Sequence, residues 1–143
     1  MRALLDVCSL LALIDANHQF HLKVSAWFAL NAPICGWASC PLTQNGATRI
    51  LGNSGYPNQQ LPQTTLLKLA AMFAKPEHDF WPDSVSLTDP AVFNQGIILT
   101  SGQLTDVYLL GLAVKNGGRL VTTDSKILTT AVVGFQSGNL IVL

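Results

Sequence analysis

Met1-Arg-Ala-Leu-Leu-Asp6 opens the chain as a short apolar run that ends in a single carboxylate. A run of this kind is typical of a buried strand, so the acid that follows it is expected at the strand's carboxyl end. In open α/β sheets, binding sites form at the carboxyl ends of the strands. A buried charge there is costly unless a cation or hydrogen-bond donors compensate it, so Asp6 should have partners elsewhere in the chain.

Beyond Asp6 the sequence alternates between strand-like and helix-like segments. Further strands are expected at residues 34–39, 78–81, 119–123 and 140–143. Helices are expected at residues 9–16 (with Ser9 as the N-cap), 20–31 (ended by Asn31 and Pro33), 42–51, 64–75 and 105–115, with short ones near 91–93 and from Ser125. Short strands alternating with helices predict an α/β fold. We expect a single domain over residues 1–143, with a central parallel sheet of four to five short strands flanked by helices.

The composition is apolar and poorly charged. The chain has 143 residues, of which 49% are hydrophobic and 11% charged, with eight basic and eight acidic side chains and no formal net charge. Average globular chains are roughly 25% charged. Such a surface should carry an apolar patch, which favours a homo-oligomer or an obligate partner. Nucleic-acid binding would have to rest on local basic residues and a metal rather than on overall charge.

The sequence also indicates a location. Asp6 interrupts the apolar run that follows Arg2, so we expect no secretion signal. No segment approaches the roughly 18 uninterrupted apolar residues of a membrane helix. Cys8, Cys35 and Cys40 are an odd number of cysteines and are expected to be buried, reduced thiols. These features predict a cytoplasmic protein that does not enter a membrane.

Two more aspartates occupy informative places. Asp106 lies in the first turn of the expected helix at 105–115, where a carboxylate also complements the helix dipole. Asp124 follows the strand at 119–123, where it could be a helix N-cap. A parallel sheet would bring both to the same edge as Asp6, and three neighbouring carboxylates repel one another unless a cation lies between them. Mg²⁺ or Mn²⁺ suits such a site. The bound ion would activate a water molecule there, so the site is expected to hydrolyse phosphodiesters.

Four motifs, taken together and in order, cover essentially the whole chain. They are Leu4-Leu5-Asp6-Val7, Cys40-Pro41-Leu42-Thr43-x-Asn45-Gly46-x-x-Arg49-Ile50, Leu104-Thr105-Asp106-x-Tyr108-Leu109-x-x-Leu112-Ala113 and Gly117-Gly118-x-Leu120-x-Thr122-x-Asp124. This set resembles the PIN-domain ribonucleases, and specifically the VapC toxins of bacterial VapBC toxin–antitoxin modules. The resemblance implies a Mg²⁺- or Mn²⁺-dependent endoribonuclease, usually a homodimer, inhibited by a VapB antitoxin that threads into the active-site groove.

The chain departs from this pattern at two positions. The family places a glutamate after Pro-Leu-Thr, and this chain has Gln44. A carboxamide keeps the shape but removes one negative charge, so metal affinity and water activation should fall. A naturally weakened member and a variant silenced by substitution both agree with Gln44. The family's common asparagine two residues after Asp6 is replaced by Cys8, which should alter a hydrogen bond behind the site.

These arguments assign roles to particular residues. Asp6, Asp106 and Asp124 are expected to hold the metal and, with Gln44, to form the catalytic set. Arg49 lies on the same expected helix as Gln44 and either contacts a phosphate or an antitoxin carboxylate or is simply solvated. Thr122 is expected to face the site and to hydrogen-bond a metal-bound water.

Two alternatives remain beside the ribonuclease. One is a catalytically inactive PIN-like protein that binds RNA or an antitoxin without turnover. The other is a phosphohydrolase of the haloacid-dehalogenase kind, which needs a second aspartate two residues after Asp6, where this chain has Cys8. His78, next to Glu77 and Asp79, is interpreted as a solvated strand edge.

Overall fold

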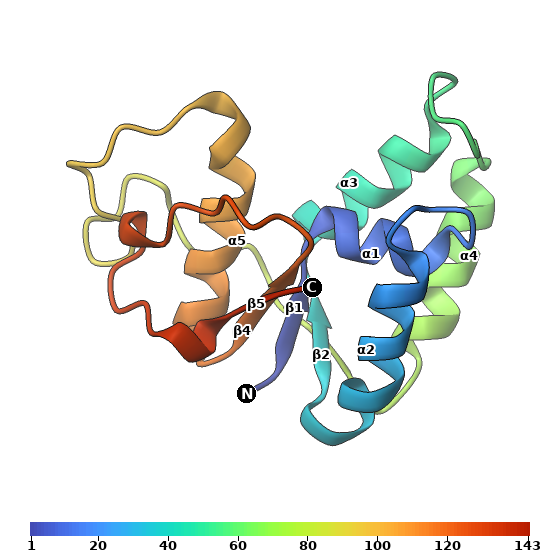
Figure 1. Ribbon diagram of the computed structural model, residues 1–143, viewed down its shortest axis with the longest axis horizontal. Helices are drawn as coiled ribbons and strands as arrows, with labels where there is room; N and C mark the ends of the chain where they lie inside the picture. The colour runs from blue at the N-terminus through green and yellow to red at the C-terminus, as the bar shows by residue number, and fades with distance from the viewer.

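Five short parallel strands form the centre of the molecule (Figure 1). The computed structural model describes all 143 residues. The strands are β1 (Ala3–Leu5), β2 (Trp37–Ser39), β3 (His78–Phe80), β4 (Arg119–Thr122) and β5 (Leu140–Val142), in the order β3-β2-β1-β4-β5. The first strand of the chain is thus the middle strand of the sheet, with Leu4 opposite Ala38 on one side and Leu120 on the other. The expected α/β fold with a parallel sheet is confirmed.

Five α-helices cover the two faces of this sheet unequally (Figure 1). They are α1 (Val7–Ile14), α2 (His21–Cys35), α3 (Pro41–Gly52), α4 (Pro62–Phe73) and α5 (Leu104–Lys115). The first four pack on one face, and α5 lies on the other together with the loops before and after it. No helix is long and apolar enough to cross a membrane.

Each face of the sheet has its own hydrophobic core, because successive side chains of a strand point to opposite sides. Leu4 and Leu120 pack with the buried face of α5, which includes Leu109 and Leu112. Their neighbours Leu5 and Val121 belong to the other core. That second core also contains apolar residues of α1 to α4, namely Leu10, Leu11, Ala32, Ala47, Leu51 and Leu69.

Several expected helix boundaries are wrong. The second helix continues past Asn31 and Pro33 to Cys35, and Pro33 is accommodated on the exposed side of its last turn. It stops at Gly36, whose φ of 70° places the backbone in the left-handed region that favours glycine. The fourth helix begins at Pro62, two residues earlier than expected, with the proline at a position that needs no N–H donor.

Two expected short helices are absent. Residues 91–93 lie in a turn-rich loop, and the chain after Ser125 forms turns and two single-turn 3₁₀ segments, Thr129–Ala131 and Ser137–Asn139. The N-cap of α1 is Asp6 rather than Ser9, because the Asp6 backbone is extended and its carboxylate accepts from the Ser9 N–H. One residue therefore ends the central strand and begins the first helix.

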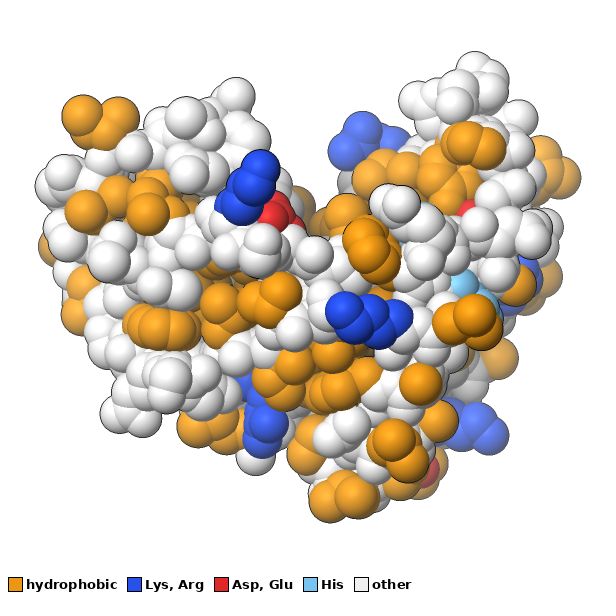
Figure 2. Space-filling model, in the orientation of Figure 1, with side chains coloured by type: hydrophobic (Ala, Val, Ile, Leu, Met, Phe, Trp, Pro, Cys, Tyr) orange, Lys and Arg blue, Asp and Glu red, His pale blue; other side chains and the backbone are white.

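The carboxyl ends of the strands lie beneath a depression in the surface. Figure 2 shows the molecule hollowed between the part that contains α5 and the part that contains α3. The ends of β1 and β4 and the first turn of α5 meet at this edge of the sheet. The fold therefore brings residues from the beginning and the end of the chain to one place.

Candidate active site at the carboxyl edge of the sheet

Asp6 is a buried and incompletely compensated carboxylate. Its side chain is only 3% exposed and accepts one hydrogen bond, at 2.5 Å, from the Ser9 backbone N–H. Its own N–H donates to Val121 O at 3.0 Å, which ties the end of β1 to β4. Burial raises the pKa of Asp6, the nearby Thr122 hydroxyl and the Ser9 amide oppose that shift, and the charge of Asp124 adds to it. The net result is a raised pKa, so the ionised form lacks a sufficient partner.

Asp106 and Asp124 reach the same edge from two other elements. Asp106 is half-buried in the first turn of α5, and burial together with the charges of Asp6 and Asp124 raises its pKa to about 6. Asp124 is exposed just beyond β4, where Oδ1 accepts from the Lys126 N–H at 2.8 Å in a tight turn. This turn takes the place of the helix expected after Asp124. The structure thus brings together all three aspartates singled out in the sequence.

Cys8 lies near the same three charges. Partial desolvation, followed by the charges of Asp6, Asp106 and Asp124, raises the pKa of its thiol to about 11. Cys8 is exposed in the first turn of α1, not buried as expected. The thiol is therefore protonated at neutral pH and is a poor metal ligand.

The carboxylates suit a hard cation in type and charge. Their donor atoms are all oxygens, which Mg²⁺ and Mn²⁺ prefer, and the only ion pair in the protein joins Arg2 to Asp79 at 3.8 Å, away from this edge. No group of three His, Cys, Asp or Glu side chains is arranged to enclose a metal ion. Ligation by all three aspartates would therefore need their side chains to turn inward, which a bound cation would favour because it removes their mutual repulsion.

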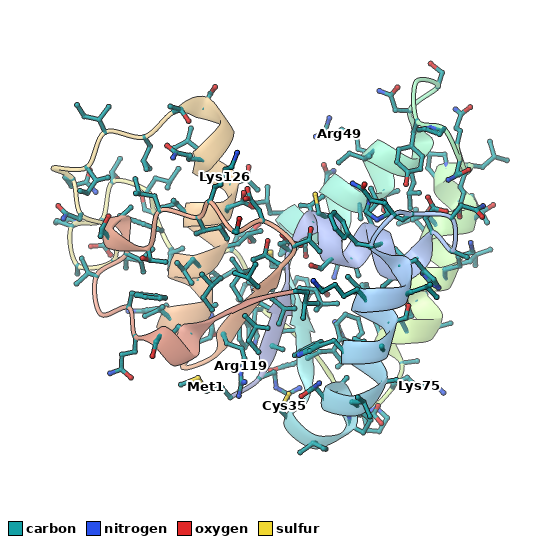
Figure 3. All side chains as sticks on the ribbon, in the orientation of Figure 1. Met1, Cys35, Arg49, Lys75, Arg119 and Lys126 are labelled. Atoms are coloured by element: carbon teal, nitrogen blue, oxygen red, sulfur yellow. The ribbon has the colours of Figure 1, made fainter.

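Thr122 and Arg49 lie in different settings. Thr122 is fully buried, and its hydroxyl accepts from the Asp124 N–H at 2.9 Å, so it links Asp6 to the turn that carries Asp124. Arg49 is exposed near the end of α3 and lines two shallow surface hollows. Figure 3 shows Arg49 on one side of the depression and Lys126 on the other. Lys126, which the sequence did not single out, shares a hollow of about 180 Å³ with Asp106 and Asp124.

Comparison with known proteins gives the family. No family model matches the chain. Ribonuclease VapC44 of Mycobacterium tuberculosis is 41% identical over 143 residues, which is the full length of both chains. Ribonuclease VapC39 of the same organism is 36% identical over 135 residues, covering 94% of this chain and 96% of that protein. The chain belongs to the VapC ribonuclease family.

Solved VapC structures share the fold at low sequence identity. The crystal structure of Mycobacterium tuberculosis VapC20, a sarcin-ricin loop cleaving toxin, aligns with a TM-score of 0.58 at 12% identity, covering 82% of this chain and 85% of that one. VapBC2 from Rickettsia felis, solved bound to a DNA fragment from its promoter, aligns with a TM-score of 0.59 at 14% identity, covering 88% and 90%. The fold is thus shared with these VapC structures although little of the sequence is identical.

Gln44 of this VapC chain is directed at neighbours other than the three aspartates. Its Nε2 donates to Ser39 Oγ at 3.0 Å, and Ser39 Oγ lies 2.8 Å from His78 Nε2. No hydrogen bond joins Gln44 to any of the acids. His78 lies on the edge strand β3 as interpreted, but it is half-buried and stacked on Phe73 rather than freely solvated. The only sequence signal for this contact was the position of Ser39 and His78 on adjacent expected strands.

Proposed function

We propose that this VapC chain is a metal-dependent endoribonuclease toxin that cleaves RNA phosphodiesters. The observation that carries the proposal is the carboxylate edge, where three aspartates lie so close that neighbouring charges raise the pKa of Asp6 and of Asp106. A cluster of acids that form no ion pair is costly in a folded protein unless it serves a bound cation. The family's ribonucleases agree with this assignment.

Mg²⁺ or Mn²⁺ would be held by Asp6, Asp106 and Asp124, and when bound it would lower the pKa of a water molecule and stabilise the leaving oxygen. Asp6 is suited to anchor the cation, because its rotamer is fixed by the Ser9 N–H and by burial. Asp106 and Asp124 are more exposed and can adjust to the ion and the substrate. Thr122 would keep Asp6 and Asp124 in register rather than reach the substrate directly, since it is fully buried.

Arg49 and Lys126 would bind the phosphates on either side of the scissile bond. They lie on opposite sides of the depression, and no carboxylate is paired with either of them (Figure 3). With only two cations at the depression, the ionic part of RNA binding would be small. The logarithm of affinity would fall with the logarithm of salt concentration with a slope of about −1.4, on a single-strand coefficient of roughly 0.7 per phosphate contact.

Partners follow from the family and from the surface. We propose a VapB-type antitoxin and a homodimer. In support, α2 and α4 expose large apolar side chains, among them Leu22 at 83%, Ile34 at 86% and Leu67 at 65%. A hollow of about 470 Å³ lies between these two helices, lined mostly by apolar residues that include Phe28 and Met72. We place the reaction in the cytoplasm, which suits three free cysteines.

A second candidate function is binding of RNA or antitoxin without turnover. Gln44 favours it, because the family's fourth carboxylate is missing. An RNA cleavage assay with Mg²⁺ or Mn²⁺ separates the two, comparing the chain with Gln44→Glu and Asp6→Asn. The ribonuclease predicts metal-dependent cleavage that Asp6→Asn abolishes. Absence of cleavage in the chain and in Gln44→Glu, with RNA still bound, would favour the binding protein.

A further inference from the structure

A hydrogen-bond chain connects residue 44 to a histidine on the edge strand of the sheet. Gln44 on α3 donates through Nε2 to Ser39 Oγ on β2, and Ser39 Oγ lies 2.8 Å from Nε2 of His78 on β3. Ser39 is fully buried, so its hydroxyl cannot exchange these partners for bulk water. The three side chains therefore form one unit, in which the direction of each hydrogen bond constrains the next.

The His78 ring is fixed in place by aromatic neighbours. It stacks on Phe73 with a centroid distance of 4.3 Å and an interplanar angle of 18°, and it lies 4.5 Å from the Trp37 ring. Burial lowers the pKa of His78, although the charge of Asp79 opposes that shift. The imidazole is therefore neutral at pH 7, with one ring nitrogen protonated and the other an acceptor.

The donors along the chain fix which nitrogen carries the proton. An amide nitrogen can only donate, so Ser39 Oγ accepts from Gln44. Ser39 Oγ has no hydrogen-bond partner other than Gln44 and His78, so the hydrogen of this buried hydroxyl points to His78 Nε2, which is then the unprotonated acceptor. The His78 proton belongs on Nδ1. No protein group donates to Gln44 Oε1, so the acceptor end of the side chain remains available.

A glutamate at position 44 would reverse the direction of these hydrogen bonds. Its carboxylate can only accept, so the Ser39 hydroxyl would donate to it, and Ser39 Oγ would in turn accept from a protonated His78 Nε2. We propose that Ser39 and His78 are positioning residues that fix the side chain at position 44, and that the residue at this position selects the tautomer of His78. The functional part of this inference rests on the proposed ribonuclease, whereas the tautomer does not.

The tautomer can be measured directly by long-range ¹H–¹⁵N correlation spectra of labelled protein. His18→Gln and His21→Gln remove the other two imidazoles, which assigns the His78 signals. We expect the Nδ1–H form in the chain as it is and the Nε2–H form in Gln44→Glu. Ser39→Ala should make the His78 tautomer the same in both backgrounds, because the connection is cut. An Nε2–H form in the unmodified chain, or one tautomer in both, would overturn the inference.

Kinetics test the positioning role separately. In the Gln44→Glu background, Ser39→Ala should lower kcat about tenfold with KM unchanged, and Ser39→Thr, which keeps the hydroxyl, should restore it. An unchanged kcat in Ser39→Ala would overturn the positioning role. If no variant cleaves RNA while the tautomer switches as expected, the proposed ribonuclease fails and the hydrogen-bond chain remains.

Discussion

Helix α1 has a buried aspartate at each end, and the two carboxylates differ in their hydrogen-bond donors and charged neighbours. Asp6 at the start is 3% exposed and Asp15 at the end is 2% exposed. Asp15 accepts from Tyr56 OH at 2.5 Å, Asn58 Nδ2 at 3.1 Å and the Asn17 N–H at 3.0 Å. Asp6 accepts from the Ser9 N–H and lies near the Thr122 hydroxyl, and it has Asp106 and Asp124 as acidic neighbours.

The two pKa directions express this difference. Burial alone would raise the pKa of Asp15, but its three hydrogen bonds outweigh burial and lower the pKa overall. At Asp6 burial prevails and the pKa is raised. Asp15 is fully supplied with donors and holds the loop of residues 53–61 against α1, although a helix C-terminus disfavours an acid. A buried acid whose donors do not offset desolvation is a better candidate for chemistry than one whose donors do.

The largest expected effect is the difference in RNA cleavage between variants at the two ends of α1. Asp6→Asn should reduce metal-dependent RNA cleavage by at least about a hundredfold, since it neutralises the proposed anchor of the cation. Asp15→Asn should retain most of the activity when assayed well below its unfolding temperature. A comparable loss of cleavage in Asp15→Asn, with its circular dichroism unchanged, would remove the distinction.

The free energy of unfolding should show the reverse order, with the larger loss in the variant at Asp15. Asp15→Asn should lower the free energy of unfolding by about 2 kcal/mol, because its hydrogen bonds lose their charged acceptor and one amide group replaces an oxygen. Asp6→Asn should cost far less, because it removes a charge that the fold does not compensate. Urea denaturation measures both. Tyr56→Phe, which deletes one donor to Asp15, is the matched control and should cost about 1 kcal/mol.

A fourth carboxylate would make the Asp6 end more acidic still. Gln44→Glu should raise the affinity for Mn²⁺ about tenfold, as calorimetric titration would show, because it restores a negative charge beside the cation. Gln63→Glu adds the same charge on the exposed surface of α4 and should leave the affinity unchanged. Equal affinities in the chain and in Gln44→Glu would exclude position 44 from the cation's surroundings.

The smallest expected effect concerns pH. Burial raises the folded pKa of Asp106 to about 6, above the value near 4 expected of an unfolded chain. Between these two pH values Asp106 is protonated in the folded protein but ionised in the unfolded chain. The contribution of Asp106 to stability is thus largest at low pH and declines as pH rises towards 6. Asp106→Asn should raise Tm by about 2–4 °C at pH 7 and leave it unchanged at pH 4. The lowered pKa of Asp15 acts in the opposite sense, since its stabilisation is lost as pH falls.

The carboxylate edge could be predicted because it follows from topology. Asp6 and Asp124 each come after an apolar strand, and parallel neighbours must end at the same edge. Asp106 lies at the start of the helix that crosses back to β4, so it belongs to that edge as well. Sequence periodicity and the rule for parallel strands were sufficient for this part of the site.

The polar contacts around the site could not be predicted, because they depend on side chains far apart in the sequence. The sequence does not reveal the role of Asp15, since two of its three donors, Tyr56 and Asn58, come from a loop some 40 residues later. Gln44 turns to Ser39 and His78, a contact that needs the register of β2 and β3. Pro33 misled the prediction of a helix end, because local preference alone does not reveal that the decisive stop is Gly36.

The place of β1 in the middle of the sheet has a consequence for synthesis on the ribosome. Asp6 emerges among the first residues, yet its N–H pairs with Val121 O, and the turn that holds Asp124 comes later still. Through most of translation the growing chain lacks the carboxylates that complete the edge. The protein cannot acquire its acidic cluster until β4 has emerged and inserted beside β1, so the carboxylate edge is completed only late in synthesis.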